Sequence, residues 1–394
     1  MLRVWAKPLV ALAAVCALSW TVASPAGIAP VDERALAARV VTAPPITAEP
    51  ATTTTTPPPP PPTTTATTGA PPTTMAPPTT RAAAAAPKPP PSTAPPVAVR
   101  APVSTLSVTL PPVTPPPPRD LSVYKGLGTW VDAYDFSPEY QPNGAPPPVT
   151  AESVDQMVGQ GVRTLYLQAA KDDTRSPGEL VNPELLGPML ARAHSHGIKV
   201  VAWYLPKFYD LDSDMRRLLA MRDFRYDGEG FDGLGLDIEW REDVPNNAER
   251  NSRLIELSRR LRRAMGDAAV SAIPLPPVLT EVINPAYWPG FPWRELAPLY
   301  DVWMPMGYWT FRTRSSGYKD GYRYTVENIR RLRADLGLPA APVHPVGGTD
   351  NKSTDEDYRG FVRACAEEHA MGGSIYDWRT TPSQAWGILR AVPD

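Results

Sequence analysis

Residues 231–240 read Phe-Asp-Gly-Leu-Gly-Leu-Asp-Ile-Glu-Trp, and this stretch decides the expected fold. In a β-strand, successive side chains point to opposite faces. Two leucines and Ile238 would therefore share one face, and Asp237 and Glu239 would share the other with two glycines. A strand that is apolar on one face and carries carboxyl groups on the other suits an α/β (β/α)8 TIM barrel. In that fold, helices cover the outside and the reaction site lies in the upper interior.

The closeness of the two acids favours a functional site over a solvated strand end. Side chains two residues apart on a strand lie only about 7 Å apart, so two carboxylates there repel each other. The alternative, an exposed strand end whose acids are merely solvated, gives no reason for that repulsion to be tolerated.

The composition divides the chain before any motif does. The chain has 394 residues, a formal net charge of −2 and 52 prolines, most of which precede residue 120. The absence of a basic excess argues against nucleic acid as a partner. Segment 120–394 has the usual size of one (β/α)8 barrel, and we expect it to be the catalytic domain and to act as a monomer.

Residues 1–26 have the pattern of an export signal. Arg3 and Lys7 flank the start of an apolar run over residues 8–23, and small residues follow it. The run is short for a membrane span. Cleavage after Ala23 and retention as an N-terminal membrane anchor both stay open. In either case we expect a protein that is secreted or associated with the cell envelope.

Residues 27–119 are rich in proline, threonine and alanine, with one run of six prolines at 57–62. Such a segment cannot bury a core and lacks many of the amide donors that regular structure needs, so we expect a disordered, extended spacer. At about 3.1 Å per residue, its roughly 75 most proline-rich residues would reach on the order of 200 Å. The spacer is interpreted as a tether that carries the folded domain through or away from a cell envelope.

The folded segment alternates short apolar stretches with amphipathic ones. The strand candidates are residues 126–134, 164–168, 199–204, 231–240, 269–273, 301–308, 342–346 and 373–378. The helix candidates are residues 150–161, 183–196, 213–223, 248–265, 325–336, 355–369 and 382–389, with Ser213 as the cap of the third. A doubly wound sheet is the competing arrangement. The barrel is preferred because polar and aromatic residues end nearly every strand, as if they converged on one mouth.

Acids and aromatic residues fall together at these strand ends. The acids are Asp132, Asp135, Asp237, Glu239 and Asp377. The aromatic residues are Trp130, Trp203, Tyr204, Trp240, Tyr308, Trp309, Tyr376 and Trp378. A sugar packs its C–H face on an aromatic ring while its hydroxyl groups bind carboxylates, so this combination predicts a polysaccharide substrate. Core packing is the alternative for any one of the tryptophans.

Glycosidic bond cleavage needs an acid that is still protonated near neutral pH. A second carboxylate two residues away raises the pKa of such a group by like-charge repulsion. We therefore expect Glu239, nearer the mouth, to donate the proton and Asp237, one layer deeper, to tune and orient it. The sequence lacks the histidine-rich spacing of most metal sites, so neither a metal nor a cofactor is expected.

The segment Asp232-Gly-Leu-Gly-Leu-Asp-Ile-Glu239 resembles the fourth-strand motif of family 18 glycoside hydrolases and related bacterial barrels. Met306-Gly-Tyr308 resembles the sixth-strand motif of that family, and Trp378 resembles its eighth-strand tryptophan. The resemblance implies that Glu239 is the acid. It implies that Asp237 orients the N-acetyl group of the substrate, which itself acts as the nucleophile. Tyr308 would support that group, Met306 would lie beside it, and Trp378 would form the floor under the sugar.

Two positions differ from the family 18 pattern. Gly235 stands in place of the middle Asp, and Trp309 follows the tyrosine where Asp or Asn is common. Family 25 lysozymes are a second resemblance, because they combine Asp-x-Glu on strand four with acids on strands one and eight. Asp132, Asp237, Glu239 and Asp377 would fill those places.

The sequence thus predicts an exported, tethered glycoside hydrolase that acts on an N-acetylated or cell-wall polysaccharide, either chitin-like or peptidoglycan. One alternative is a carbohydrate-binding barrel with a degenerate site, which Gly235 supports. Another is an unrelated barrel enzyme with a metal held by the acids.

Overall fold

The computed structural model describes residues 112–348 and 352–394. The predicted export signal or anchor and residues 27–111 of the predicted spacer lie outside the described residues. Within the described part of the chain, no helix has both the length and the apolar character needed to cross a membrane.

Nine parallel strands form one sheet in the described residues, in the order β6-β5-β4-β3-β2-β1-β9-β8-β7. Their bounds are β1 Gly126–Val131, β2 Thr164–Gln168, β3 Lys199–Tyr204, β4 Gly233–Ile238, β5 Val270–Pro274, β6 Val302–Trp303, β7 Met306–Gly307, β8 Val346–Gly347 and β9 Gly372–Ile375. The predicted strands over 164–168 and 199–204 are confirmed residue for residue. β5 has the predicted length but lies one residue later, and the other strands are shorter than predicted.

The predicted strand 301–308 is two strands, β6 and β7, separated by Met304 and Pro305. Proline has no amide hydrogen and so interrupts a ladder. β6 pairs with β5, and β7 pairs with β8. Trp303 of β6 also bridges to Val343, on the segment that leads into β8. This segment therefore contacts both neighbours, and the sheet closes into an eight-membered barrel, as predicted.

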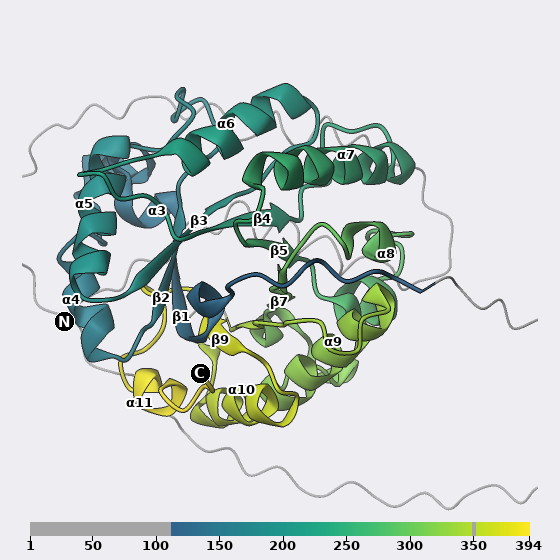
Figure 1. Ribbon diagram of the computed structural model, residues 1–394. Helices are drawn as coiled ribbons and strands as arrows, with labels where there is room; N and C mark the ends of the chain where they lie inside the picture. The colour runs from purple at the N-terminus through teal and green to yellow at the C-terminus, as the bar shows by residue number, and fades with distance from the viewer. Residues whose placement is uncertain (1–111, 349–351) are drawn as a thin grey trace, which may run out of the picture. The chain divides into compact units, whose positions relative to one another are not determined.

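Helices surround the strands (Figure 1) and follow them along the chain. Their bounds are α3 Ala133–Phe136, α4 Ser153–Gly159, α5 Pro183–Ser195, α6 Leu211–Asp223, α7 Asn247–Met265, α8 Trp293–Leu296, α9 Gly321–Leu336, α10 Asp355–Glu367 and α11 Ala385–Leu389. The single-turn or irregular helices are η2 Ser122–Tyr124, η3 Pro138–Tyr140, η4 Pro142–Gly144, η5 Val278–Ile283, η6 Trp309–Phe311 and η7 Arg314–Ser316. Right-handed helical crossovers of this kind are what adjacent parallel strands require.

Side-chain caps set where several helices begin. Asp210 caps α6 by accepting hydrogen bonds from the amides of Asp212 and Ser213, both at 3.0 Å. The prediction of Ser213 as the cap is therefore wrong, because the carboxylate three residues earlier takes its amide hydrogen. Asp320 caps α9 in the same way, so α9 begins at Gly321, earlier than predicted.

Ring side chains fill the barrel near the amino ends of the strands. The Tyr124 hydroxyl donates to the Leu234 carbonyl at 3.0 Å. The buried His344 contacts the Tyr124 carbonyl through Nδ1 at 2.7 Å and the Tyr166 hydroxyl through Nε2 at 3.4 Å. Burial lowers the pKa of His344 to about 4, so the ring is neutral near pH 7. This end of the barrel is a packed core, which leaves the carboxyl ends of the strands for a site.

A buried ion-pair cluster joins the beginning of the domain to the barrel. Asp301, whose side chain is 2% exposed, pairs with Arg119 and Arg262, each at 2.7 Å. It also accepts the amide hydrogen of Val270 at 2.9 Å. The carboxylate thereby connects the segment before η2, helix α7 and strand β5.

We expect Asp301→Ala to lower the free energy of unfolding by about 3–5 kcal/mol, because it leaves two partly buried guanidinium groups without their partner. Urea unfolding of the purified protein would measure this change. The matched control is Asp394→Ala, since Asp394 forms only a longer, exposed pair with Arg163 at 3.8 Å. The control should change stability by less than about 0.5 kcal/mol. Equal effects of the two substitutions would contradict the role given to Asp301.

Candidate active site

A cleft opens at the carboxyl ends of the strands, with about 480 Å³ of empty space that includes the solvent at its mouth. Residues from seven strand ends line it: Trp130, Asp132, Tyr134, Gln168, Lys171, Trp203, Leu205, Asp237, Glu239, Ile273, Met306, Tyr308 and Tyr376. Carboxyl groups, aromatic rings and one ammonium group therefore face the same space.

Strand β4 and the residue directly after it place two carboxyl groups in the cleft. Asp237 and Glu239 both line it, and only 6% and 4% of their surfaces are exposed. Leu236 and Ile238, which alternate with them, are fully buried. The alternation predicted for this strand is thus what the structure has, and the acids lie on the inner face.

Burial dominates the electrostatics of this pair. It raises the pKa of Glu239 to about 7, against the opposing effect of the Lys171 ammonium. Burial, and next the charge of Glu239, raise the pKa of Asp237 well above its usual range. Asp237 Oδ1 has no hydrogen-bond partner among the described residues, as suits a carboxyl group that keeps its proton. Repulsion between the two carboxyl groups thus adds to the effect of burial, as the charge of Glu239 on Asp237 shows.

Ile273 and Ser271 of β5 lie closest to Gly235, below the acids. Gly235 lies directly before the two acids on the same face of β4. A Cβ atom at this position would come within 2.8 Å of Ile273 Cδ1 and 3.1 Å of Ser271 Oγ. Ile273 therefore occupies the space into which a larger side chain at position 235 would point. An aliphatic group beneath Asp237 cannot donate a hydrogen bond, which is why burial controls the pKa of that carboxyl group.

Aromatic rings form the walls, and their positions are fixed by contacts with each other. The ring of Trp130 stacks on Tyr166, with 4.5 Å between centroids, and meets the edge of Trp203 at 5.8 Å. Trp130 Nε1 donates to Ser374 Oγ at 2.8 Å. The ring centroid of Tyr376 lies 5.8 Å from that of Tyr308, and both rings line the cleft. Rigid apolar faces beside carboxyl groups are the surface that a sugar ring needs.

Asp132 has a double role at the end of β1. Its Oδ1 accepts the amide hydrogen of Tyr134 at 2.9 Å and so caps α3. Its Oδ2 accepts the hydroxyl hydrogen of Tyr376 at 2.5 Å. Both carboxylate oxygens are thus engaged within the protein while the side chain lines the cleft.

Three buried carboxyl groups near this point could offer oxygens to a metal ion. In the described residues, Asp132, Asp135 and Asp377 each have an oxygen within 4.8 Å of the others. Each also has a protein partner. Arg379 Nη1 lies 3.7 Å from Asp135 Oδ1, and the backbone amide of Thr380 donates to Asp377 at 2.8 Å. Hydrogen bonds and charge within the protein account for this cluster.

Six residues predicted at the mouth do not line the cleft: Asp135, Tyr204, Trp240, Trp309, Asp377 and Trp378. Tyr204 follows Trp203 on β3 and therefore faces the helices, where its hydroxyl donates to Asp214 of α6 at 2.6 Å. Trp309 begins the irregular segment after β7 and packs on Phe361 of α10, with 5.7 Å between centroids.

The other two tryptophans also have neighbours outside the cleft. Trp378 packs on Trp386 of α11 at 5.0 Å between centroids. It therefore belongs to the helix layer and does not form the floor of the cleft. Trp240, which directly follows Glu239, donates from Nε1 to Asp243 at 3.2 Å, and the Lys207 ammonium lies 5.2 Å from its ring centroid. It lies in the loop above the strand, outside the lining of the cleft.

Tyr376, expected among the aromatic residues at the strand ends, lines the cleft, and sequence reasoning missed five of the lining residues: Tyr134, Gln168, Lys171, Leu205 and Ile273. The alternation of strand 164–168 could have indicated Gln168, whose Oε1 accepts the amide hydrogen of Ala133 at 2.9 Å. Lys171 and Leu205 lie in loops, where side-chain direction follows no period.

Comparison with known proteins agrees with the barrel. No protein-family model and no curated protein sequence matches the chain. An endo-1,4-β-D-mannanase from Thermotoga petrophila matches its structure with a TM-score of 0.50 at 13% identity, over 64% of this chain and 88% of the mannanase. A class V chitinase from Pseudomonas fluorescens matches with a TM-score of 0.50 at 10% identity, over 68% of this chain and 99% of the chitinase. At such identities the likeness concerns the fold, and the chain shares the (β/α)8 barrel of these glycoside hydrolases.

Proposed function

We propose that the protein hydrolyses glycosidic bonds in an N-acetylated or cell-wall polysaccharide, with Glu239 as the proton donor. The observation that carries this proposal is the burial of Glu239 in the cleft, with a pKa raised to about 7. A carboxyl group protonated at that pH, at the carboxyl end of a barrel strand and among aromatic rings, suits protonation of a glycosidic oxygen.

In the reaction that we infer, Glu239 gives its proton to the oxygen of the scissile bond as the bond to the anomeric carbon breaks. The carbonyl oxygen of the substrate's own N-acetyl group attacks that carbon, while Asp237 accepts the N–H of the group and orients it. Water then opens the cyclic intermediate, and Glu239 takes back a proton. Tyr308 would support the N-acetyl group, and Trp130 and Trp203 would hold the sugar ring. No step requires a cofactor.

The same cleft supports a second candidate, a carbohydrate-binding barrel without turnover. The observation in its favour is Ile273, which fills the space beside Gly235 where family 18 enzymes carry the middle Asp of the motif. The muramidase alternative of the family 25 type has less support, because Asp377 lies outside the cleft lining that contains Asp132, Asp237 and Glu239.

The setting of the reaction is also part of the proposal. Residues 1–26 would direct export or membrane anchoring, and the spacer would hold the catalytic domain away from its attachment point. Polysaccharides outside the cytoplasm, chitin-like or peptidoglycan, would then be the accessible substrates. We expect the protein to act as a monomer.

We expect Glu239→Gln to lower the rate of cleavage by at least about 100-fold, because the amide cannot donate the proton. The substrates are chitin oligosaccharides and, separately, purified peptidoglycan, with products followed by mass spectrometry. Wild-type cleavage of either substrate establishes the hydrolase. If wild type and Glu239→Gln both bind a glycan and neither cleaves it, the result favours the carbohydrate-binding barrel.

The pH profile offers an independent test of the proton donor. Because the pKa of Glu239 is about 7, kcat/KM should fall as the pH rises through about 7, where the donor loses its proton. The profile is measured on a chitin oligosaccharide or on peptidoglycan fragments. A rate that stays constant from pH 5 to pH 9 would exclude Glu239 as the donor.

Folding stability should carry the same signature. The pKa of Glu239 is raised from 4.5 to about 7 in the folded protein, so the stability this group contributes is present below pH 4.5 and is lost as the pH rises through 7. A shift of this size corresponds to about 3 kcal/mol. The free energy of unfolding of Glu239→Gln minus that of wild type should therefore be larger at pH 8 than at pH 4.5. Urea unfolding at the two pH values measures the difference, and a pH-independent difference would show that Glu239 is not buried as an acid.

A further inference from the structure

Lys171 is the one basic side chain among the described residues that line the cleft. It lies in the loop after β2 and belongs to none of the sequence motifs described above. Its ammonium group faces the space that holds Asp237 and Glu239. The nearby carboxyl groups decide whether this charge is neutralised within the protein, because a half-buried charge without a partner is costly unless a ligand supplies one.

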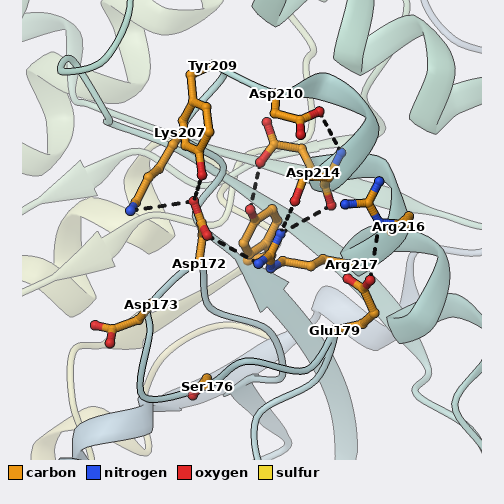
Figure 2. A network of polar contacts seen from close by, with 12 residues as sticks. Asp172, Asp173, Ser176, Glu179, Lys207, Tyr209, Asp210, Asp214, Arg216 and Arg217 are labelled. Atoms are coloured by element: carbon orange, nitrogen blue, oxygen red, sulfur yellow. Dashed lines mark hydrogen bonds and ion pairs between the residues drawn. The ribbon is translucent and has the colours of Figure 1, made fainter.

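The two acids that follow Lys171 in the sequence bind other cations. Figure 2 shows Asp172 at the centre of a network, where it accepts the Tyr209 hydroxyl hydrogen at 3.0 Å. Arg217 Nη2 lies 3.2 Å and Lys207 Nζ lies 3.5 Å from the same carboxylate. Asp173 binds Arg175 through both of its oxygens, at 3.0 and 2.8 Å. Both carboxylates are thus bound directly by other cations, and Lys171 acts on Asp173 only through its longer-range charge.

Aromatic faces hold the ammonium group instead. Lys171 Nζ lies 4.9 Å from the ring centroid of Tyr134 and 5.8 Å from that of Tyr140. Such contacts fix the direction of a cation without neutralising its charge. No carboxylate of the described residues lies within 4.0 Å of Lys171 Nζ in an ion pair.

The acids across the cleft do not cancel the charge of Lys171 either. Asp132 uses both oxygens within the protein, for the Tyr376 hydroxyl and the Tyr134 amide. Burial favours the protonated, neutral form of Asp237. Glu239 has to be protonated to act as the donor. During the first step of the reaction, the cleft thus presents one ammonium group without a counter-ion of its own.

We propose that Lys171 binds a carboxylate carried by the polysaccharide, so that the cleft selects a glycan with an acidic sugar next to the bond that is cut. This inference rests on the proposed function, because it names the substrate class of the same site. The contacts of Lys171 carry it: an ammonium group that is directed into the cleft by two rings and whose neighbouring acids are bound elsewhere. A compact ammonium group suits a carboxylate at the end of a sugar substituent.

Two sugars supply this chemistry. The carboxylate can belong to the lactyl ether of a muramic acid or to C6 of a uronic acid. Both alternate with N-acetylglucosamine in natural polymers, so the N-acetyl group required by the proposed mechanism is available in each. A neutral N-acetylglucosamine polymer lacks the carboxylate and serves as the reference.

The test measures binding by calorimetry to the full-length Glu239→Gln variant, which should not turn over its ligands. The ligands are three tetrasaccharides: N-acetylglucosamine alone, N-acetylglucosamine alternating with peptide-free N-acetylmuramic acid, and N-acetylglucosamine alternating with glucuronic acid. We expect at least one acidic tetrasaccharide to bind more tightly than the neutral one, and the tighter of the two identifies the source of the carboxylate.

Adding Lys171→Met should weaken binding of that acidic ligand by about tenfold to a hundredfold and leave the neutral ligand unchanged. Methionine keeps an apolar side chain of similar length, and Lys171→Arg should restore most of the affinity. The matched control is Lys207→Met, which removes a lysine of the neighbouring loop that is already paired with Asp172. Equal loss for acidic and neutral ligands, or the same loss from Lys207→Met, would overturn the inference.

Ionic strength tests the charge without altering Lys171, should Lys171→Met fail to fold. The preference of Glu239→Gln for the acidic ligand should shrink in 1 M salt, and a preference that does not change with salt would overturn the inference.

Failure of this inference is distinguishable from failure of the proposed function. Wild-type cleavage of any tetrasaccharide, together with equal binding of the acidic and neutral ligands to Glu239→Gln, keeps the hydrolase and removes the role of Lys171. Binding that depends on Lys171, without cleavage of any ligand, keeps the role of Lys171 and removes the hydrolase.

Discussion

The removal of the Asp237 and Glu239 carboxyl groups from water is the constraint on which the rest of the site depends. A buried carboxylate is costly unless it is paired or hydrogen-bonded. Here Ile273 lies below the pair and aromatic rings form the walls. The protonated form of the carboxyl groups is therefore lower in free energy than the ionised form. The strand could not carry these two acids at the centre of the barrel with both ionised. The raised pKa of each follows from the fold itself.

The polar network in Figure 2 shows how the protein holds the loops that frame this pair. Helix α6 supplies Arg217 to Asp172, on the loop after β2. The same helix supplies Asp214, which accepts the Tyr204 hydroxyl hydrogen and the Phe208 amide hydrogen. Burial raises the pKa of Asp214 to about 6. The loops after β2 and β3 are thus fixed to one helix by charge and hydrogen bonds, and with them Lys171 at the edge of the cleft.

The sequence determined the fold more fully than the site. Strands with a hydrophobic period and glycine or polar ends were predictable, and so was the inner face of β4, because alternation within a strand is a geometric necessity. The break at Pro305 was readable in principle, since a residue without an amide hydrogen cannot continue a ladder. Which helix faces which strand, and so where Trp309 and Trp378 would pack, depended on contacts between distant segments.

Alternation also explains the errors at the strand ends. Trp203 and Tyr204 are adjacent on one strand, so both could not enter the cleft, and the prediction that included both overlooked this. Past the last strand residue the period-2 rule no longer applies. Trp240 therefore lies in a loop above the cleft, while Lys171, for which the sequence offers no signal, lies in the lining.

Gly235 connects these observations. Where the related motif carries an Asp beneath the reacting acids, this chain has no side chain, and Ile273 from the adjacent strand fills the space. A hydrogen-bond chain that would share protons among several carboxyl groups is replaced by an apolar contact. Two influences then set the pKa values of Asp237 and Glu239. Burial raises both pKa values, and the Lys171 ammonium lowers them. A ligand anion at Lys171 would remove the second of these and strengthen the hold of Glu239 on its proton. Substrate charge and proton donation would thereby be linked through one lysine.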